Sequence, residues 1–180
     1  MKFASLKSEH KDGRLVLVSR DGTQALEVAD IAPHLIDALE RWDVVQQPLQ
    51  SAYESLNAGR AAGSFAFDPA QCLAPLPRSP QWLDGSAFLN HSNLMDQAFN
   101  KPPPPLVETV PMMYQGASDD FLGPHDAVAL PRVEDGIDFE GEFGVITGPV
   151  PMGVDAASAL ACVRLLVQIN DWSLRALGPH

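Results

Sequence analysis

Acidic side chains in the segment 138–147 stand at a spacing that could do chemistry. If this segment forms a strand, Glu140 and Glu142 project from one face about 7 Å apart, because side chains alternate between the two faces. No lysine or arginine separates them, so their repulsion is tolerable on a solvated face or beside a divalent cation. Taken alone, the spacing favours the solvated face.

Two shorter segments carry side chains that could complete a metal site. Asp84 precedes His91 by seven residues, so the carboxylate could bind a metal while the neutral imidazole accepts a proton from water. Any Asp and His at this spacing would qualify, and the pair alone indicates little. Asp171 follows the apolar run 165–170 and is interpreted either as a functional side chain at a strand end or as a helix N-cap.

Together these segments resemble the fumarylacetoacetate hydrolase family between about residues 80 and 177. The matching elements, in order, are Asp84 with His91, Tyr114 in Met112-Met-Tyr-Gln-Gly116, the Glu140-Gly-Glu142 pair, and Asn170-Asp171-Trp-Ser173. Four elements in the family's order are more specific than any one of them. The first 75 residues resemble, more loosely, the small accessory domain that many members carry.

The resemblance implies a divalent cation, Mg²⁺ or Ca²⁺ with Mn²⁺ as an alternative. The implied ligands are the residues at the family's metal positions: Asp84, Glu140, Glu142 and Asp171. Oxygen donors alone are what such hard cations prefer. The position of His91 implies the general base that activates water, and the position of Tyr114 implies contact with the substrate.

The implied activity is hydrolysis of a C–C bond in a small 2,4-diketo acid of the fumarylacetoacetate or acylpyruvate type. It would proceed through a metal-stabilised enolate, in the catabolism of aromatic compounds such as tyrosine. Related members use the same chemistry for hydration, decarboxylation or isomerisation, so these activities stay open. The resemblance also implies a homodimer.

The resemblance further implies that the chain is the front part of a family member. Members continue into further strands and carry a lysine beyond the Asn-Asp-Trp-Ser motif, whereas the last lysine here is Lys101. Many hydrolases of the family have a glutamine where Gly178 stands. A metal-binding fragment without turnover, acting by association, is therefore one alternative. A β-rich domain whose acidic second half is only a solubilising surface is another.

Composition excludes several other classes of protein. The 180 residues carry 12 basic and 23 acidic side chains, a net charge of −11, and residues 91–180 hold only 4 of the basic ones against 12 acidic. A basic stripe for nucleic acid is therefore not expected, and no apolar run reaches the roughly 18 residues of a membrane span. Two cysteines, Cys72 and Cys162, fit neither a disulfide framework nor a zinc cluster, and we expect a cytoplasmic protein.

The elements that must position the candidate residues are mostly short strands. We predict an α+β, β-rich fold: a mixed β-roll or distorted barrel (76–180) preceded by a small α+β domain (1–75), with prolines between them. Short apolar runs and turn signals predict strands at 14–19, 25–28, 108–114, 127–130, 137–147 and 165–170. Helices are predicted at 32–42, from apolar residues at helical spacing, and at 48–58. Asp155 is expected to cap a helix from Ala156. The face of Phe139, Phe143 and Val145 is expected to be core.

Overall fold

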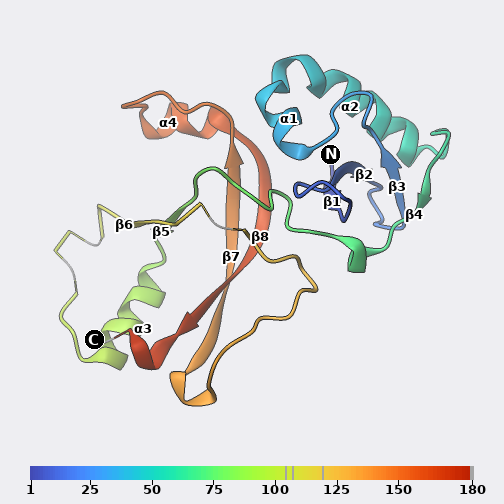
Figure 1. Cartoon of the computed structure of the whole chain (residues 1–180). Coiled ribbons are helices and arrows are strands. Elements are labelled where there is room, and N and C mark those ends of the chain that lie inside the picture. Colours follow the sequence, from blue (N-terminus) through green and yellow to red (C-terminus); the bar gives the residue numbers. More distant parts are fainter. Residues whose placement is uncertain (104, 107, 119, 179–180) are drawn as a thin grey trace.

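A computed structural model describes residues 1–103, 105–106, 108–118 and 120–178 of the chain. The predicted α+β fold is confirmed. A four-stranded sheet with two helices forms the N-terminal part, and two two-stranded sheets with further helices follow it (Figure 1). The described residues form no closed barrel.

The N-terminal sheet is an antiparallel meander. Its strands are β1 (Phe3–Leu6), β2 (Arg14–Val18), β3 (Gln24–Glu27) and β4 (Phe65–Ala66), paired in that order. The strands predicted at 14–19 and 25–28 are confirmed, whereas β1 was not predicted. At the turn between β2 and β3, Gly22 takes a φ of +76° and the carboxylate of Asp21 accepts a hydrogen bond from the Thr23 amide at 3.1 Å.

Both faces of this sheet are buried. Leu15 and Leu17 of β2 pack against helices α1 (Leu35–Glu40) and α2 (Trp42–Asn57), while Val16 and Val18 pack with Cys72 on the opposite face. The predicted helices are confirmed, but α2 begins six residues before the predicted position and includes Pro48. Trp42, Val45 and Leu49 supply the buried stripe that extends α2 toward its N-terminus.

The next elements follow the proline-rich segment, which contains the 3₁₀ turn η1 (Pro69–Gln71) near its start. β5 (Leu83–Ser86) pairs antiparallel with β6 (Met112–Gln115), and α3 (Leu89–Phe99) lies between them in sequence. α3 was not predicted, because its N-cap position is Phe88, which has no side-chain acceptor. The strand predicted at 127–130 is wrong, since those residues form no ladder.

A long hairpin carries the acidic segment. β7 (Ile137–Thr147) pairs antiparallel with β8 (Val163–Leu174), which confirms the two predicted strands and lengthens the second. The 3₁₀ turns η2 (Val133–Asp135) and η4 (Arg175–Leu177) flank one end of the hairpin, and α4 (Ala156–Ala159) with η3 (Leu160–Cys162) connects the strands at the other. Asp155 caps α4 as predicted, since its carboxylate accepts the Ser158 amide at 2.9 Å.

The inward face of this hairpin is the opposite of the one expected. Phe139 and Val145 are exposed and Phe143 is 86% exposed, whereas Glu140 and Glu142 are partly buried. The expectation that the aromatic face is core is therefore wrong for the described residues. The reason is that α3 approaches the acidic face, while no described element covers the aromatic one.

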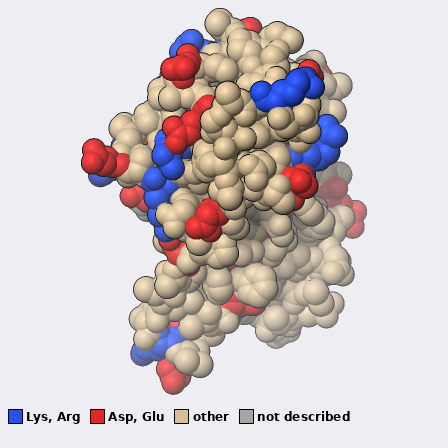
Figure 2. Space-filling model, turned by 90° about the vertical axis from the view of Figure 1, so that its right-hand side faces the viewer, with Lys and Arg blue, Asp and Glu red and all other residues tan. Residues whose placement is uncertain are grey.

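The far end of the hairpin rests against the N-terminal part. Ile146 and Leu165 pack on the core of the first sheet. Outside the hairpin, the Phe121 amide of the loop after β6 donates to the carbonyl of Pro77 in the proline-rich segment at 2.7 Å. On the face shown in Figure 2, basic and acidic side chains are intermingled over the upper part. None of the described helices is both long enough and apolar enough to traverse a membrane.

Candidate metal centre

The acidic centre forms where β7 and β8 pair. Glu140 lies directly opposite Asp171 in the ladder, and Glu142 follows two residues along the same face. One carboxylate oxygen from each of the three lies within 4.8 Å of the others. Asp171 is inside β8, so its interpretation as a helix N-cap is wrong. Strand register thus brings together three of the four residues predicted to bind a metal.

Asp84 reaches the same neighbourhood from β5. Its charge is near enough to raise the pKa of both Glu142 and Asp171, although its carboxylate is not within the group of three. β5 places it opposite Tyr114 in the β5–β6 ladder. Asp84 therefore lies at the margin of the acidic group, beside the residue predicted to contact substrate.

His91 lies in the first turns of α3 and faces the acidic group. Its Nε2 is 3.4 Å from Oε2 of Glu140, and its side chain is 45% exposed. An imidazole beside a carboxylate and still open to water has the access that a general base needs. The structure thus places the predicted base beside a predicted metal ligand rather than within the group itself.

Tyr114 borders an aromatic hollow next to Asp84. The hollow has a volume of about 190 Å³ and is lined by Trp82, Tyr114, Ala117, Asp120 and Phe121. The Trp82 ring centroid is 5.7 Å from those of both Tyr114 and Phe121, and its Nε1 donates to the Ala117 carbonyl at 2.7 Å. Gly116 packs directly on the indole, where a Cβ would collide with it. The sequence did not predict the roles of Trp82 and Phe121 here.

Electrostatics set the acidic group apart from ordinary surface carboxylates. Burial, followed by repulsion from Asp84, Asp171 and Glu140, raises the pKa of Glu142. Burial and repulsion from Glu140 and Asp84 likewise raise the pKa of Asp171. Such desolvated, mutually repelling oxygen donors fit a hard divalent cation, because its charge would relieve both costs.

Arg175 is a member of the centre that sequence reasoning missed. Its Nη2 bonds Oε1 of Glu140, and its Nε donates to Oδ2 of Asp138 at 3.2 Å. This pairing lowers the pKa of Asp138. The Arg175 amide also donates to the Gly136 carbonyl at 2.9 Å, which directs the chain back over the acidic face. The only sequence signal was a basic residue four positions after Asp171.

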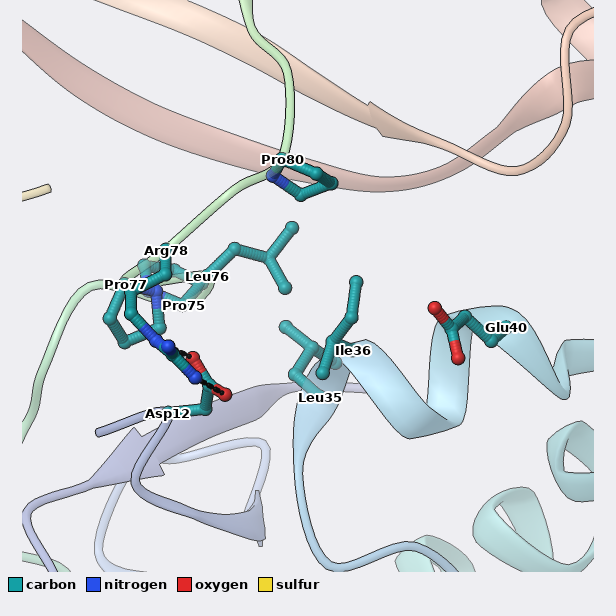
Figure 3. Close-up of a pocket in the computed structure, with 9 residues that line it drawn as sticks. All are labelled: Asp12, Leu35, Ile36, Glu40, Pro75, Leu76, Pro77, Arg78 and Pro80. Carbon is teal, nitrogen blue, oxygen red and sulfur yellow. Dashed lines mark hydrogen bonds and ion pairs between the residues drawn. The ribbon is translucent and has the colours of Figure 1, made fainter. Parts of the chain in front are cut away.

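A separate cleft lies between α1 and the proline-rich segment (Figure 3). Its volume is about 300 Å³, and its lining residues are Asp12, Leu35, Ile36, Glu40, Pro75, Leu76, Pro77, Arg78 and Pro80. Arg78 already donates to both carboxylate oxygens of Asp12, at 2.9 and 2.5 Å. None of the predicted site residues lines this cleft, and the charge of its one arginine, Arg78, is neutralised by Asp12.

Two family matches together span almost the whole chain. Residues 1–78 match the family described as fumarylacetoacetase N-terminal domain 2. Residues 81–179 match the family described as fumarylacetoacetate hydrolase C-terminal. The second match covers more than half of the chain and includes every predicted site residue.

A solved structure shares the fold. The crystal structure of a candidate HpcE protein from Mycobacterium smegmatis superposes with a TM-score of 0.68 at 20% sequence identity. The alignment covers 98% of this chain and 57% of that one. The chain therefore spans little more than half the length of this neighbour. No curated protein sequence matches the chain.

Proposed function

Because the chain belongs to the fumarylacetoacetate hydrolase family, we propose that it takes part in divalent-cation-dependent hydrolysis of a C–C bond in a 2,4-diketo acid. The resemblance expected from the sequence is confirmed by the two family matches. Family membership supports an enzyme of the broad fumarylacetoacetate hydrolase type. The substrate and the type of reaction belong to the proposal.

One observation carries the proposal. Three carboxylates from β7 and β8 converge within 4.8 Å, and the imidazole of His91 lies 3.4 Å from one of them. Glu140, Glu142 and Asp171 would hold the cation, with Asp84 as a fourth ligand from β5. When bound there, a divalent cation supplies Lewis-acid stabilisation of negative charge that develops on substrate oxygens.

His91 would act on water. Its neutral imidazole accepts a proton from a water molecule, and the resulting hydroxide adds to the acyl carbonyl carbon. The C–C bond then breaks, its electron pair passes to the neighbouring carbon, and that carbon takes up a proton. Hydrolysis of an acylpyruvate in this way gives a carboxylic acid and pyruvate, so atoms and charge balance. Glu140 orients His91 through the 3.4 Å contact.

The aromatic hollow would receive the acyl part of the substrate. Tyr114 lies opposite Asp84, so a substrate held at the acidic group has this hollow beside it. The faces of Trp82 and Phe121 offer apolar contact, and the phenol of Tyr114 offers a hydrogen bond to a carbonyl or carboxylate oxygen. The hollow thus supports a substrate with a small apolar or aromatic acyl group.

The test measures Mg²⁺ binding and pyruvate release from acylpyruvates by the purified chain. We expect His91→Ala to retain Mg²⁺ affinity and to lower kcat about 10²- to 10⁴-fold, because it removes a base and not a ligand. His125→Ala is the matched control, since His125 is an exposed loop histidine and should leave both quantities unchanged.

Other outcomes separate the alternatives. Loss of Mg²⁺ binding in His91→Ala would show that the assigned roles are wrong. Release of CO₂ instead of pyruvate would identify a decarboxylase. Mg²⁺ binding with no turnover of any diketo acid would favour the metal-binding fragment.

A further inference from the structure

The aromatic hollow lies on the same face of the β5–β6 ladder as Asp84. Trp82 precedes Asp84 by two residues, and the pairing continues to it, since the Gly116 amide donates to the Trp82 carbonyl at 3.1 Å. Side chains two residues apart on a strand share a face and lie about 7 Å apart. Tyr114 stands opposite Asp84 on that face. An acyl chain of a few carbons, on a substrate held at the acidic group, would therefore reach the hollow.

The indole of Trp82 gives the hollow a fixed apolar wall. Its Nε1 donates to the Ala117 carbonyl at 2.7 Å, and the backbone of Gly116 packs directly on its ring. The rings of Tyr114 and Phe121 lie on either side, each with its centroid 5.7 Å from that of Trp82. Apolar or flat groups bind well against such faces. Aromatic contact alone, however, does not decide which charge an acyl group can carry.

The charge of the hollow comes from one residue. Among the described residues that line it, only Asp120 is charged, and its side chain has neither a hydrogen bond nor an ion pair within the described part of the chain. The nearby cation is Arg78, whose pKa is raised by its hydrogen bonds to Asp12 and, to a smaller extent, by the charge of Asp120. Because Arg78 donates to both carboxylate oxygens of Asp12, its charge is already paired. An anionic group in the hollow would thus meet a like charge and no lining cation.

We propose that Asp120 is a specificity-determining residue, which disfavours acyl groups that end in a carboxylate and directs the chain to acylpyruvates with a neutral acyl group. The inference rests on the proposed function and names its substrate class. A second carboxylate would be repelled by Asp120 and would exchange water for aromatic faces, whereas a neutral group pays neither cost. Repulsion of this kind selects against a competitor without adding a contact to the favoured substrate. Because Asp120 is exposed and water screens its charge, we expect a discrimination of roughly three- to tenfold.

The experiment compares two compounds that differ in charge alone: an acylpyruvate whose acyl chain ends in a carboxylate, and the same compound as its terminal primary amide. Pyruvate release by the full chain in MgCl₂ gives kcat/KM for each. We expect the amide to be favoured, and the ratio of the two kcat/KM values to fall roughly three- to tenfold in Asp120→Asn, which keeps the shape of the side chain. Asp30→Asn is the matched control, since Asp30 is exposed in the N-terminal part and its loss should leave the ratio unchanged.

Salt provides a second measurement, which a merely structural role of Asp120 would not move. The preference of the unaltered chain for the amide should shrink when KCl is raised from about 0.05 to 0.5 M, because exposed charges are screened. In Asp120→Asn this dependence on salt should be weaker. Asp120→Ser, which also removes the charge, carries the test if Asp120→Asn does not fold.

Three results would overturn this inference. Equal kcat/KM values for the two compounds in the unaltered chain would leave the proposed hydrolysis intact and show that the hollow does not select by charge. The same preference in Asp120→Asn as in the unaltered chain would also leave the hydrolysis intact, and would assign the selection to other carboxylates. Pyruvate release from neither compound would overturn both this inference and the proposed function.

Discussion

The N-terminal sheet and the β7–β8 hairpin use burial in opposite ways. The first buries aliphatic and aromatic side chains on both faces, from Ala4 to Ala74. Among the described residues after Pro77, no aliphatic or aromatic side chain is buried, and the hairpin partly buries carboxylates instead. Removing apolar surface from water stabilises the fold, whereas desolvating charge opposes it. One region thus buries apolar surface, and the other holds the candidate metal centre.

The largest expected effect comes from removing apolar volume from the core of the N-terminal sheet. Leu17 is fully buried between β2 and the helices, so Leu17→Ala should lower the free energy of unfolding by about 2–5 kcal/mol. Leu166→Ala is the matched control in β8, where the side chain is 77% exposed, and should change it by less than about 0.5 kcal/mol. Urea unfolding of both variants measures the difference. Equal losses of unfolding free energy in the two variants would show that the hairpin also has a buried apolar core.

A second test separates stability from chemistry at one residue. Glu142→Gln removes a charge whose pKa is raised by burial and by repulsion, so the cation-free chain should become more stable. We expect the unfolding temperature in EDTA to rise by about 1–3 °C. Mg²⁺ affinity should fall at least about a hundredfold, because an anionic ligand is lost.

The direction of the pKa shift at Glu142 fixes the sign of the stability change. A carboxyl with a raised pKa in the folded state costs stability once it is ionised above that pKa, and the amide introduced by Glu142→Gln does not ionise. Calorimetric titration and thermal unfolding measure the two effects on one preparation. Unchanged Mg²⁺ affinity would remove Glu142 from the site, and a lower unfolding temperature would show that its charge is compensated.

A third, smaller effect concerns pH in the first region. The hydrogen bond from Arg78 lowers the pKa of Asp12 below its ordinary value of 3.8. Asp12 therefore contributes stability that is present above the unfolded value and lost as the pH falls through the lower, folded one. Asp12→Asn should lower the unfolding free energy by only about 0.5–1 kcal/mol at pH 7, since the Arg78 side chain is partly exposed and water screens the pair.

The difference in unfolding free energy between Asp12→Asn and the unaltered chain should disappear as the pH falls below 3.8. In that range Asp12 of the unaltered chain also becomes protonated and loses its charge. Urea unfolding between neutral pH and the acid range measures it. Exposed Asp30→Asn is the control and should show no such convergence. A constant difference at all pH values would mean that the Asp12–Arg78 pair does not act through charge.

The smallest expected effect comes from the aromatic face of the hairpin. Phe143 is 86% exposed, so Phe143→Ser should change the free energy of unfolding by less than about 0.5 kcal/mol. Urea unfolding at low protein concentration provides the measurement. A loss above about 1 kcal/mol would mean that this face is covered in solution, and the contrast between the two regions would then fail.

Local patterns predicted much of what this chain does within single segments. The apolar run of β2, the two-residue alternation of β7, the Asp21-Gly22 turn and the Asp155 cap depend on backbone and side-chain preferences over a few residues. The pair Glu140 and Glu142 is of the same kind, because strand geometry alone puts both on one face. α3 was not predicted, because such predictions need a local start signal and Phe88 at its N-cap position provides none.

The amino-acid sequence by itself determined the candidate ligands, the acidic balance and the family resemblance, since these depend on residue types and their order. Only the tertiary structure decided which residues meet. Pairing of β7 with β8 placed Asp171 opposite Glu140, and α3 brought His91 to the same carboxylate. Packing also turned the acidic face inward and Arg175 onto it. Strand register and the covering of a face depend on contacts between distant segments, which no local spacing contains.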